Sequence, residues 1–116
     1  MIKSWILAAA AAMILSAPAF GHAKLRATVP AADAQLPTAP KTLSLNFNED
    51  VHLAVLTLTG AGKDIPVTVD RAAPASSQPS VVLPPLPAGK YQVQWSVISA
   101  DDGHVTKGTF SFTVLP

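Results

Sequence analysis

Proline is spread along almost the whole chain, and this spacing limits the secondary structure that the chain can form. Eleven of the 116 residues are proline, and ten of these follow residue 21. Proline inside a helix removes a backbone hydrogen bond and clashes with the preceding turn. No segment after residue 21 keeps a helical period for more than a turn or two, so the chain is predicted to be all-β.

Several segments alternate bulky and polar residues, as half-buried strands do. The pattern is clearest over residues 43–47, 55–59, 91–97 and 108–114. Residues 65–69 and 80–83 are shorter candidates with proline in or beside them, and they are predicted to be edge strands. Residues 60–64 are predicted to form a turn and 72–79 a mobile surface loop. About seven short strands predict a sandwich or small Greek-key barrel.

The first 21 residues have the features of a secretory signal peptide. Lys3 is the only charge, residues 5–15 are apolar, and small residues follow. The apolar run is shorter than the roughly 20 residues that a membrane anchor needs. Ala19 and Gly21 favour cleavage before His22, and a second possible cleavage site lies before Phe20. The predicted organisation is therefore a signal peptide over 1–21 and one exported domain over 22–116, with no membrane insertion after cleavage.

The composition of residues 22–116 limits the partners and metals that the domain can bind. Without Lys3, seven Lys and Arg balance seven Asp and Glu, so charge does not attract nucleic acid or anionic lipid. The chain has no cysteine, and its methionines, Met1 and Met13, precede residue 22. A metal site must therefore use imidazole, carboxylate, amine or backbone groups. Such ligands suit Cu(II), Zn(II) or Ni(II) better than Cu(I).

Three histidines are candidates for metal binding: His22, His52 and His104. A single histidine on the surface of a β-domain is usually just solvated, and nothing raises His52 above that expectation. His22 differs because cleavage after Gly21 would give it a free α-amine. The amine and the ring Nδ1 can then bind one metal ion as a chelate.

Asp102 and His104 lie between the two longest strand patterns. Asp102-Gly103 is also a typical hairpin-turn sequence, so a purely structural role is an alternative. In an extended segment, residues two apart point to the same face, which would bring this carboxylate and imidazole together. With His22 they give a nitrogen-rich set that Cu(II) prefers, with zinc second. Glu49 could add a weak axial oxygen or orient a ligand, although acidic residues after a strand are usually solvated.

The chain resembles the CopC family of periplasmic copper-binding proteins over nearly all of residues 22–116. The segments that carry the resemblance are 22–25, 30–33, 45–49, 89–95, 99–104 and Gly108. The resemblance implies an immunoglobulin-like Greek-key β-sandwich. It also implies a Cu(II) site at His22, Asp102 and His104, and a role in periplasmic copper handling, often beside an inner-membrane CopD-type transporter.

The chain departs from the family pattern in two places. The usual Ser-x-Asp-Gly-His has an extra residue here, so Asp101 is an alternative to Asp102 as the carboxylate ligand. Family members with a Cu(I) site build it from a methionine-rich segment, which this chain lacks. One Cu(II) site and no Cu(I) site are therefore predicted.

Three classes of function follow from these residues. A non-enzymatic Cu(II) carrier or buffer explains the amino-terminal histidine, the Asp-x-His motif and the small size together. A copper-dependent oxidase of the amino-terminal-histidine type, similar to lytic polysaccharide monooxygenases, is the second. It is disfavoured because Tyr91 and Trp95 are predicted to point into the core and not to form a substrate surface. The third is a metal-free structural sandwich.

Overall fold

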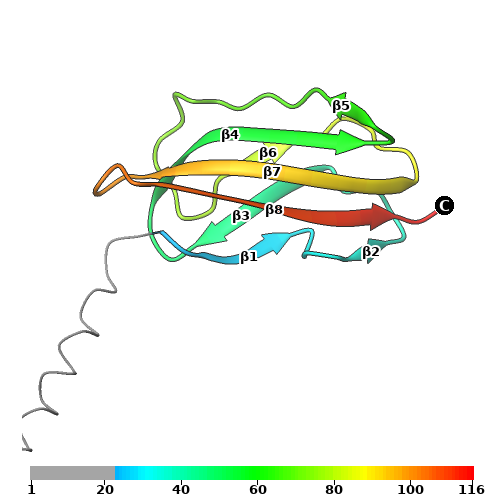
Figure 1. Ribbon diagram of the computed structural model, residues 1–116, viewed down its shortest axis with the longest axis horizontal. Helices are drawn as coiled ribbons and strands as arrows, with labels where there is room; N and C mark the ends of the chain where they lie inside the picture. Colours follow the sequence, from blue (N-terminus) through cyan, green and yellow to red (C-terminus); the bar gives the residue numbers. More distant parts are fainter. Residues whose placement is uncertain (1–22) are drawn as a thin grey trace, which may run out of the picture.

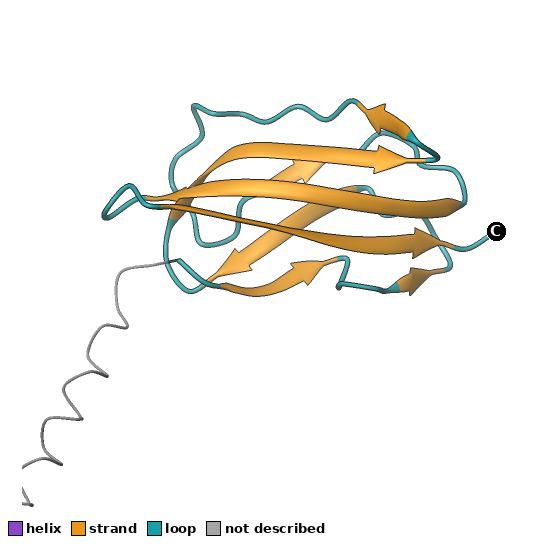
Figure 2. Cartoon of the chain, viewed as in Figure 1, coloured by secondary structure: helices purple, strands orange, loops and turns teal. Residues whose placement is uncertain are grey.

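The computed structural model describes residues 23–116 as a two-layered β-sandwich (Figures 1 and 2). The predicted signal peptide and His22 lie outside the described residues. The strands are β1 Leu25–Val29, β2 Gln35–Leu36, β3 Thr42–Phe47, β4 Val51–Gly60, β5 Lys63–Ile65, β6 Ser80–Val82, β7 Gly89–Ser99 and β8 Val105–Val114. The all-β prediction is confirmed, with eight strands where about seven were expected. Within residues 23–116 no helix is long and apolar enough to span a bilayer.

The two layers are unequal in size. One has three strands in the order β1-β3-β6, and the other has five in the order β2-β8-β7-β4-β5. All pairs are antiparallel except β2 with β8. The longest pairing is the β7–β8 hairpin, which runs from Gly89 opposite Val114 to Ile98 opposite Val105. This hairpin spans the length of the sandwich and positions the loop at its tip.

The core lies between the two layers and is built by the alternation seen in the sequence. In β3, residues 43, 45 and 47 are buried, and in β7 residues 91, 93, 95, 97 and 99 are buried. Phe47 packs edge-on against Trp95, with 5.3 Å between ring centroids, and Tyr91 stacks on Phe112 at 5.4 Å. Tyr91 and Trp95 are thus core residues, as predicted.

The β4–β5 hairpin differs from the prediction. Its strands run through Gly60 and begin again at Lys63, so only Ala61 and Gly62 form the turn. Both have positive φ, 53° and 75°, as a two-residue type I′ turn requires. Residues 66–69, predicted as strand, follow β5 and are outside it. The predicted edge strand over residues 80–83 is confirmed as β6, whereas the one over 65–69 shares only Ile65 with the edge strand β5.

Residues 72–79 form a surface loop, as the sequence predicts, and backbone hydrogen bonds attach its second half to β3 and β4. Ser76 exchanges two backbone hydrogen bonds with Val51, each 3.0 Å long. The carbonyls of Ser77 and Pro79 accept the N–H groups of Phe47 and Leu45 at 2.8 and 3.0 Å. These are separate backbone hydrogen bonds and not a continuous β-ladder. The segment therefore shows no strand periodicity in its sequence.

Candidate metal centre

The loop that joins β7 to β8 carries both residues of the Asp-x-His motif. Its ends are held by a 2.9 Å hydrogen bond from Ser99 N–H to the His104 carbonyl, and Gly103 N–H donates to the Ser99 carbonyl at 3.0 Å. Gly103 has φ 73°, whereas Asp102 is not among the residues with positive φ. A two-residue type I′ turn needs positive φ at both positions. Asp102-Gly103 is therefore not a tight two-residue turn, but Gly103 supplies the positive φ of a longer hairpin loop.

Asp102 and His104 contact each other directly. His104 Nδ1 lies 3.0 Å from Asp102 Oδ2, and His104 N–H donates to Asp102 Oδ1 at 3.0 Å. The prediction expected an extended segment, but the two side chains meet through a turn in which a carboxylate accepts the N–H two residues on. Their side chains are 58% and 31% exposed for His104 and Asp102, so both are accessible to an incoming ion.

These contacts favour the charged form of Asp102. The pKa of its carboxyl lies below the ordinary value, first because it accepts the backbone N–H of His104. Side-chain hydrogen bonds from His104 and Ser99 and the charge of His104 lower the pKa further, while desolvation opposes them. A metal ion would therefore meet a carboxylate that is already ionised.

Other carboxylates lie at the same end of the sandwich. Glu49 Oε1 accepts a 2.9 Å hydrogen bond from the hydroxyl of Ser99, and Ala100 N–H donates to the Asp50 carbonyl at 3.1 Å. These bonds join the β3–β4 connection to the β7–β8 loop. Asp101 is exposed in that loop, but the carboxylate that contacts His104 is that of Asp102.

The first described residues are anchored beside this loop. Ala23 is only 3% exposed, and its carbonyl lies 3.4 Å from the hydroxyl of Thr106, which donates to it. Lys24 N–H donates to Asn48 Oδ1 at 2.7 Å, and Asn48 N–H donates back to the Lys24 carbonyl at 3.1 Å. In Figure 1 the start of β1 and the β7–β8 loop lie at the same end, opposite the C-terminus. The residue that precedes Ala23 is His22, which is outside the described range.

Three polar residues that support this end are not singled out by the sequence: Asn48, Ser99 and Thr106. Asn48 resembles an ordinary residue after a strand, and Ser99 sits at the end of an alternating segment in which polar residues are common. Each acts through a contact between segments far apart in the chain. The one sequence clue to their role is that Asn48 and Ser99 fall within the segments that resemble CopC proteins. Thr106 lies outside those segments.

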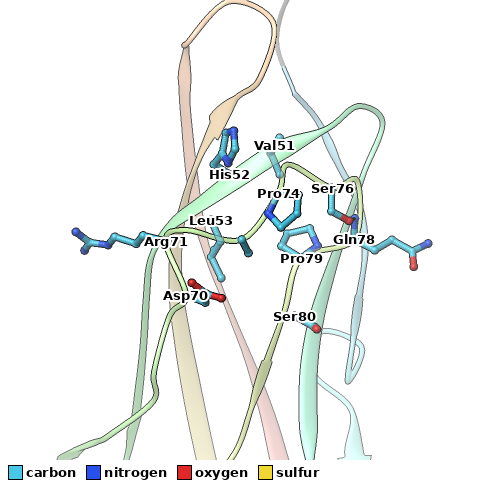
Figure 3. A pocket seen from close by; sticks show the side chains of 11 residues that line it. Val51, His52, Leu53, Asp70, Arg71, Pro74, Ser76, Gln78, Pro79 and Ser80 are labelled. Carbon is cyan, nitrogen blue, oxygen red and sulfur yellow. The ribbon is translucent and has the colours of Figure 1, made fainter.

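His52 lies on β4 opposite Ile98 of β7, and no contact joins it to Asp102 or His104 among the hydrogen bonds and ion pairs found in residues 23–116. It lines a pocket of about 230 Å³ between the start of β4 and residues 70–80 (Figure 3). The side chains of Arg71 and Gln78 point away from the prolines at its centre. Across residues 23–116, no three His, Cys, Asp or Glu side chains come together as a metal site.

These features define a single-domain β-sandwich that carries an exposed histidine–carboxylate pair at one end, next to its amino-terminal arm. The CopC domain model matches residues 25–115. The chain therefore belongs to the CopC family.

Similar proteins support this assignment over nearly the full length. The chain is 35% identical to copper resistance protein C of Escherichia coli, with 98% of each chain covered. It is 36% identical to copper resistance protein C of Xanthomonas campestris pv. juglandis, covering 90% of this chain and 88% of that protein.

Two solved structures share the fold. Crystalline CopC from Methylosinus trichosporium OB3b gives a TM-score of 0.66 at 28% identity, with 82% of this chain and 95% of that chain covered. PcoC, described as a methionine-rich copper resistance protein from Escherichia coli, gives 0.65 at 31% identity, with 81% and 99% covered. The predicted β-sandwich of the CopC type is thereby confirmed.

Proposed function

We propose that this chain is a periplasmic Cu(II)-binding protein of copper homeostasis and resistance, exported by a signal peptide over residues 1–21. One Cu(II) ion would be held by the α-amine and imidazole of His22, by Asp102 and by His104. The observation that carries the proposal is the 3.0 Å contact between Asp102 Oδ2 and His104 Nδ1 beside the anchored Ala23. Relatives named copper resistance protein C, matched over nearly their full length, support copper as the cargo.

The spacing of the pair suits a shared ion. Bonds of about 2.0 Å from a metal to nitrogen and oxygen place adjacent donors in a planar site about 2.8 Å apart. The two atoms are 3.0 Å apart in the structure. Without the ion the same two atoms share a hydrogen bond, which bonds to the metal would replace. The pair can therefore bind the ion with little rearrangement.

The contacts that hold Ala23 and Lys24 in place support His22 as a ligand of the ion. Ala23 is buried, and its carbonyl is bound by Thr106, two residues after His104. Neighbouring α-carbons are 3.8 Å apart, so an amine and imidazole carried by the preceding residue have only a short span to reach the loop. Cleavage before His22 would create the amine at that position.

The ligand set favours Cu(II) over Cu(I). The chain has no cysteine, and neither of its methionines follows residue 21. Thioether and thiolate ligands, which select Cu(I), are therefore missing from the proposed mature protein. The relative PcoC is described as methionine rich, and this chain is proposed to lack any comparable Cu(I) site.

The proposed role is binding and delivery of copper, not catalysis. Tyr91 and Trp95, the large aromatics that could form a flat substrate surface, are each 5% exposed. Amine, two imidazoles and a carboxylate also fill the four positions of a tetragonal Cu(II) plane, which leaves none there for oxygen. A CopD-type membrane transporter is the proposed partner.

The test uses protein purified from the periplasm after export, with its amino terminus established by intact mass. Titration with Cu(II) is followed by electron paramagnetic resonance, with His22→Ala as the test variant and His52→Ala as the matched control. We expect one equivalent with a nitrogen-rich tetragonal signal, lost in His22→Ala and unchanged in His52→Ala. An unchanged signal in His22→Ala, with the chain starting at residue 22, would refute the site.

A further inference from the structure

The middle of β4 has an edge that no other strand covers. β5 pairs with β4 only from Leu58 to Gly60, and the bridge from Ser76 reaches only Val51. Within residues 23–116, no backbone hydrogen bond joins residues 52–57 to a segment on the side away from β7. Unpaired N–H and C=O groups along the edge of a strand are a ready template for another chain.

This uncovered edge lies in a hollow on the surface. The hollow has a volume of about 290 Å³ and is lined by residues 52–55 of β4 together with Arg71 and Ile98. Leu53 packs toward the core, whereas Ile98 lies on the outward-facing side of β7. Because side chains that point to the two faces of a sheet line the same hollow, the hollow reaches around the edge of β4. Its backbone is therefore accessible to an incoming chain.

The lining of the hollow selects the kind of chain that fits. Val55 is 42% exposed, and Val105, which lies opposite Ile98, is 61% exposed. Arg71 is the one permanent charge that the described residues bring to the lining, and none of them brings a carboxylate. An added chain would therefore place apolar side chains on Val55 and Ile98 and a carboxylate beside Arg71.

The hollow accommodates one extended chain and not a second copy of this protein. Arg71 forms the wall that does not belong to the sheet, and the connection that carries it runs along the β4 side of the sandwich (Figure 1). A second sandwich paired edge to edge would have to displace that connection and would bring the two Arg71 side chains together. The bulge between Leu53 and Val55 also limits pairing at this edge to a short segment.

We propose that residues 52–57 are a docking site at which an extended segment of another protein, with alternating apolar and acidic side chains, pairs with β4 as an added strand. Main-chain hydrogen bonds would supply affinity, and the side chains of the hollow would supply specificity. Neighbouring strands are about 4.8 Å apart, so the added chain, two strands away from β7, would lie about 10 Å from Ile98. Since Ile98 is the residue before the last of β7, the partner would dock beside the β7–β8 loop.

The test titrates metal-free protein, purified from the periplasm, with defined peptides and follows the backbone amides by nitrogen-15 NMR. The probe is an octapeptide that alternates valine with glutamate, and a matched peptide carries lysine in place of glutamate. We expect the valine–glutamate peptide to shift the signals of residues 52–57 saturably and to slow amide hydrogen exchange there. Arg71→Gln should weaken its binding about two- to fivefold. The control, Arg26→Gln at the chain's other arginine, should leave the binding unchanged.

Methylation of the peptide nitrogens separates strand addition from simple apolar association. In a strand, the N–H groups of alternate residues point to the same edge. Of two peptides methylated on all valines or on all glutamates, only one should therefore lose binding, by about tenfold or more.

Four results would overturn the proposal. They are an equal loss from both methylated peptides, no saturable shift at residues 52–57, tighter binding of the lysine peptide, and self-association of the protein that shifts the same signals. Because no metal ion is present, each result is independent of the proposed copper site.

Discussion

Replacing Gly108 by alanine should destabilise the protein through one identifiable contact. Gly108 on β8 lies opposite Trp95 on β7. A Cβ at position 108 would lie 2.7 Å from Trp95 Cζ2 and 3.1 Å from Cε2. Carbon atoms in optimal contact are about 3.5 to 4.0 Å apart. The indole cannot move away freely, because it is 5% exposed and packs edge-on against Phe47.

The size of the effect follows from overpacking. Extra methyl groups in a packed core cost about 1 to 3 kcal/mol. For a domain of this length, about 2 kcal/mol lowers Tm by roughly 8 to 16 °C. Without the clash, alanine for glycine in a strand would be stabilising by about 0.5 to 1 kcal/mol, so the sign of the change is informative.

The assay is thermal and urea unfolding followed by circular dichroism in a double-mutant cycle with Trp95→Phe. Phenylalanine lacks the second ring that carries Cζ2, so Gly108→Ala should be neutral or slightly stabilising in the Trp95→Phe background. A coupling free energy of about 1 kcal/mol or more between positions 95 and 108 is expected. A neutral or stabilising Gly108→Ala in the natural background, or an equal cost in both backgrounds, would refute the reasoning.

Three further predictions concern the site and its scaffold. The lowered pKa of Asp102 means that its contribution to stability is present above the unfolded pKa and is lost as pH falls through the folded value. His104→Ala should raise the pKa of Asp102 in a carbon-13 NMR titration but leave it below the ordinary value of an aspartate, because the backbone N–H of residue 104 is the largest cause of the lowered pKa and is kept. An ordinary pKa in the variant would show that the imidazole, and not the backbone N–H, is the main cause. Asn48→Ala removes the acceptor for Lys24 N–H and should weaken Cu(II) binding in the competition titration, whereas unchanged affinity would show that the arm needs no such anchor. Tyr91→Phe removes the hydroxyl that donates to the Pro87 carbonyl. This change should lower the free energy of unfolding, measured in urea, by about 0.5 to 1.5 kcal/mol. An unchanged urea midpoint would show that this hydrogen bond contributes nothing to stability.

The sequence predicted the central strands well because their alternation is uninterrupted. The cores of β3, β7 and β8 were found, since one face is buried along β3 and β7 and along the second half of β8. In β4 the prediction began only at Val55, because a bulge between Leu53 and Val55 breaks the period of two. The turn at Ala61 was placed too broadly because alanine rarely adopts positive φ.

Short and exposed strands could not be predicted from local pattern. β1 has a single buried residue, Thr28, and therefore shows no alternation. β2 is two residues long and exists only through its parallel pairing with the end of β8. Both depend on partners far away in the chain.

The candidate site was predicted as a set of residue types but not as a geometry. The contact between Asp102 and His104 was expected, but from an extended segment and not from a turn. Asn48, Ser99 and Thr106 were missed, because a serine, threonine or asparagine gains its role only from what the fold places beside it. The assignment of His22 as a ligand remains a prediction.

The closed base of the β7–β8 loop has a consequence for engineering. The bond between Ser99 N–H and the His104 carbonyl continues the same pairing that runs without a shift from Ile98–Val105 to Gly89–Val114. A slip of one residue in a strand would turn every side chain to the wrong face. Insertions or deletions between residues 99 and 104 should instead be absorbed inside the loop, so its candidate ligand residues can be exchanged or its length changed while the sandwich beneath it stays intact.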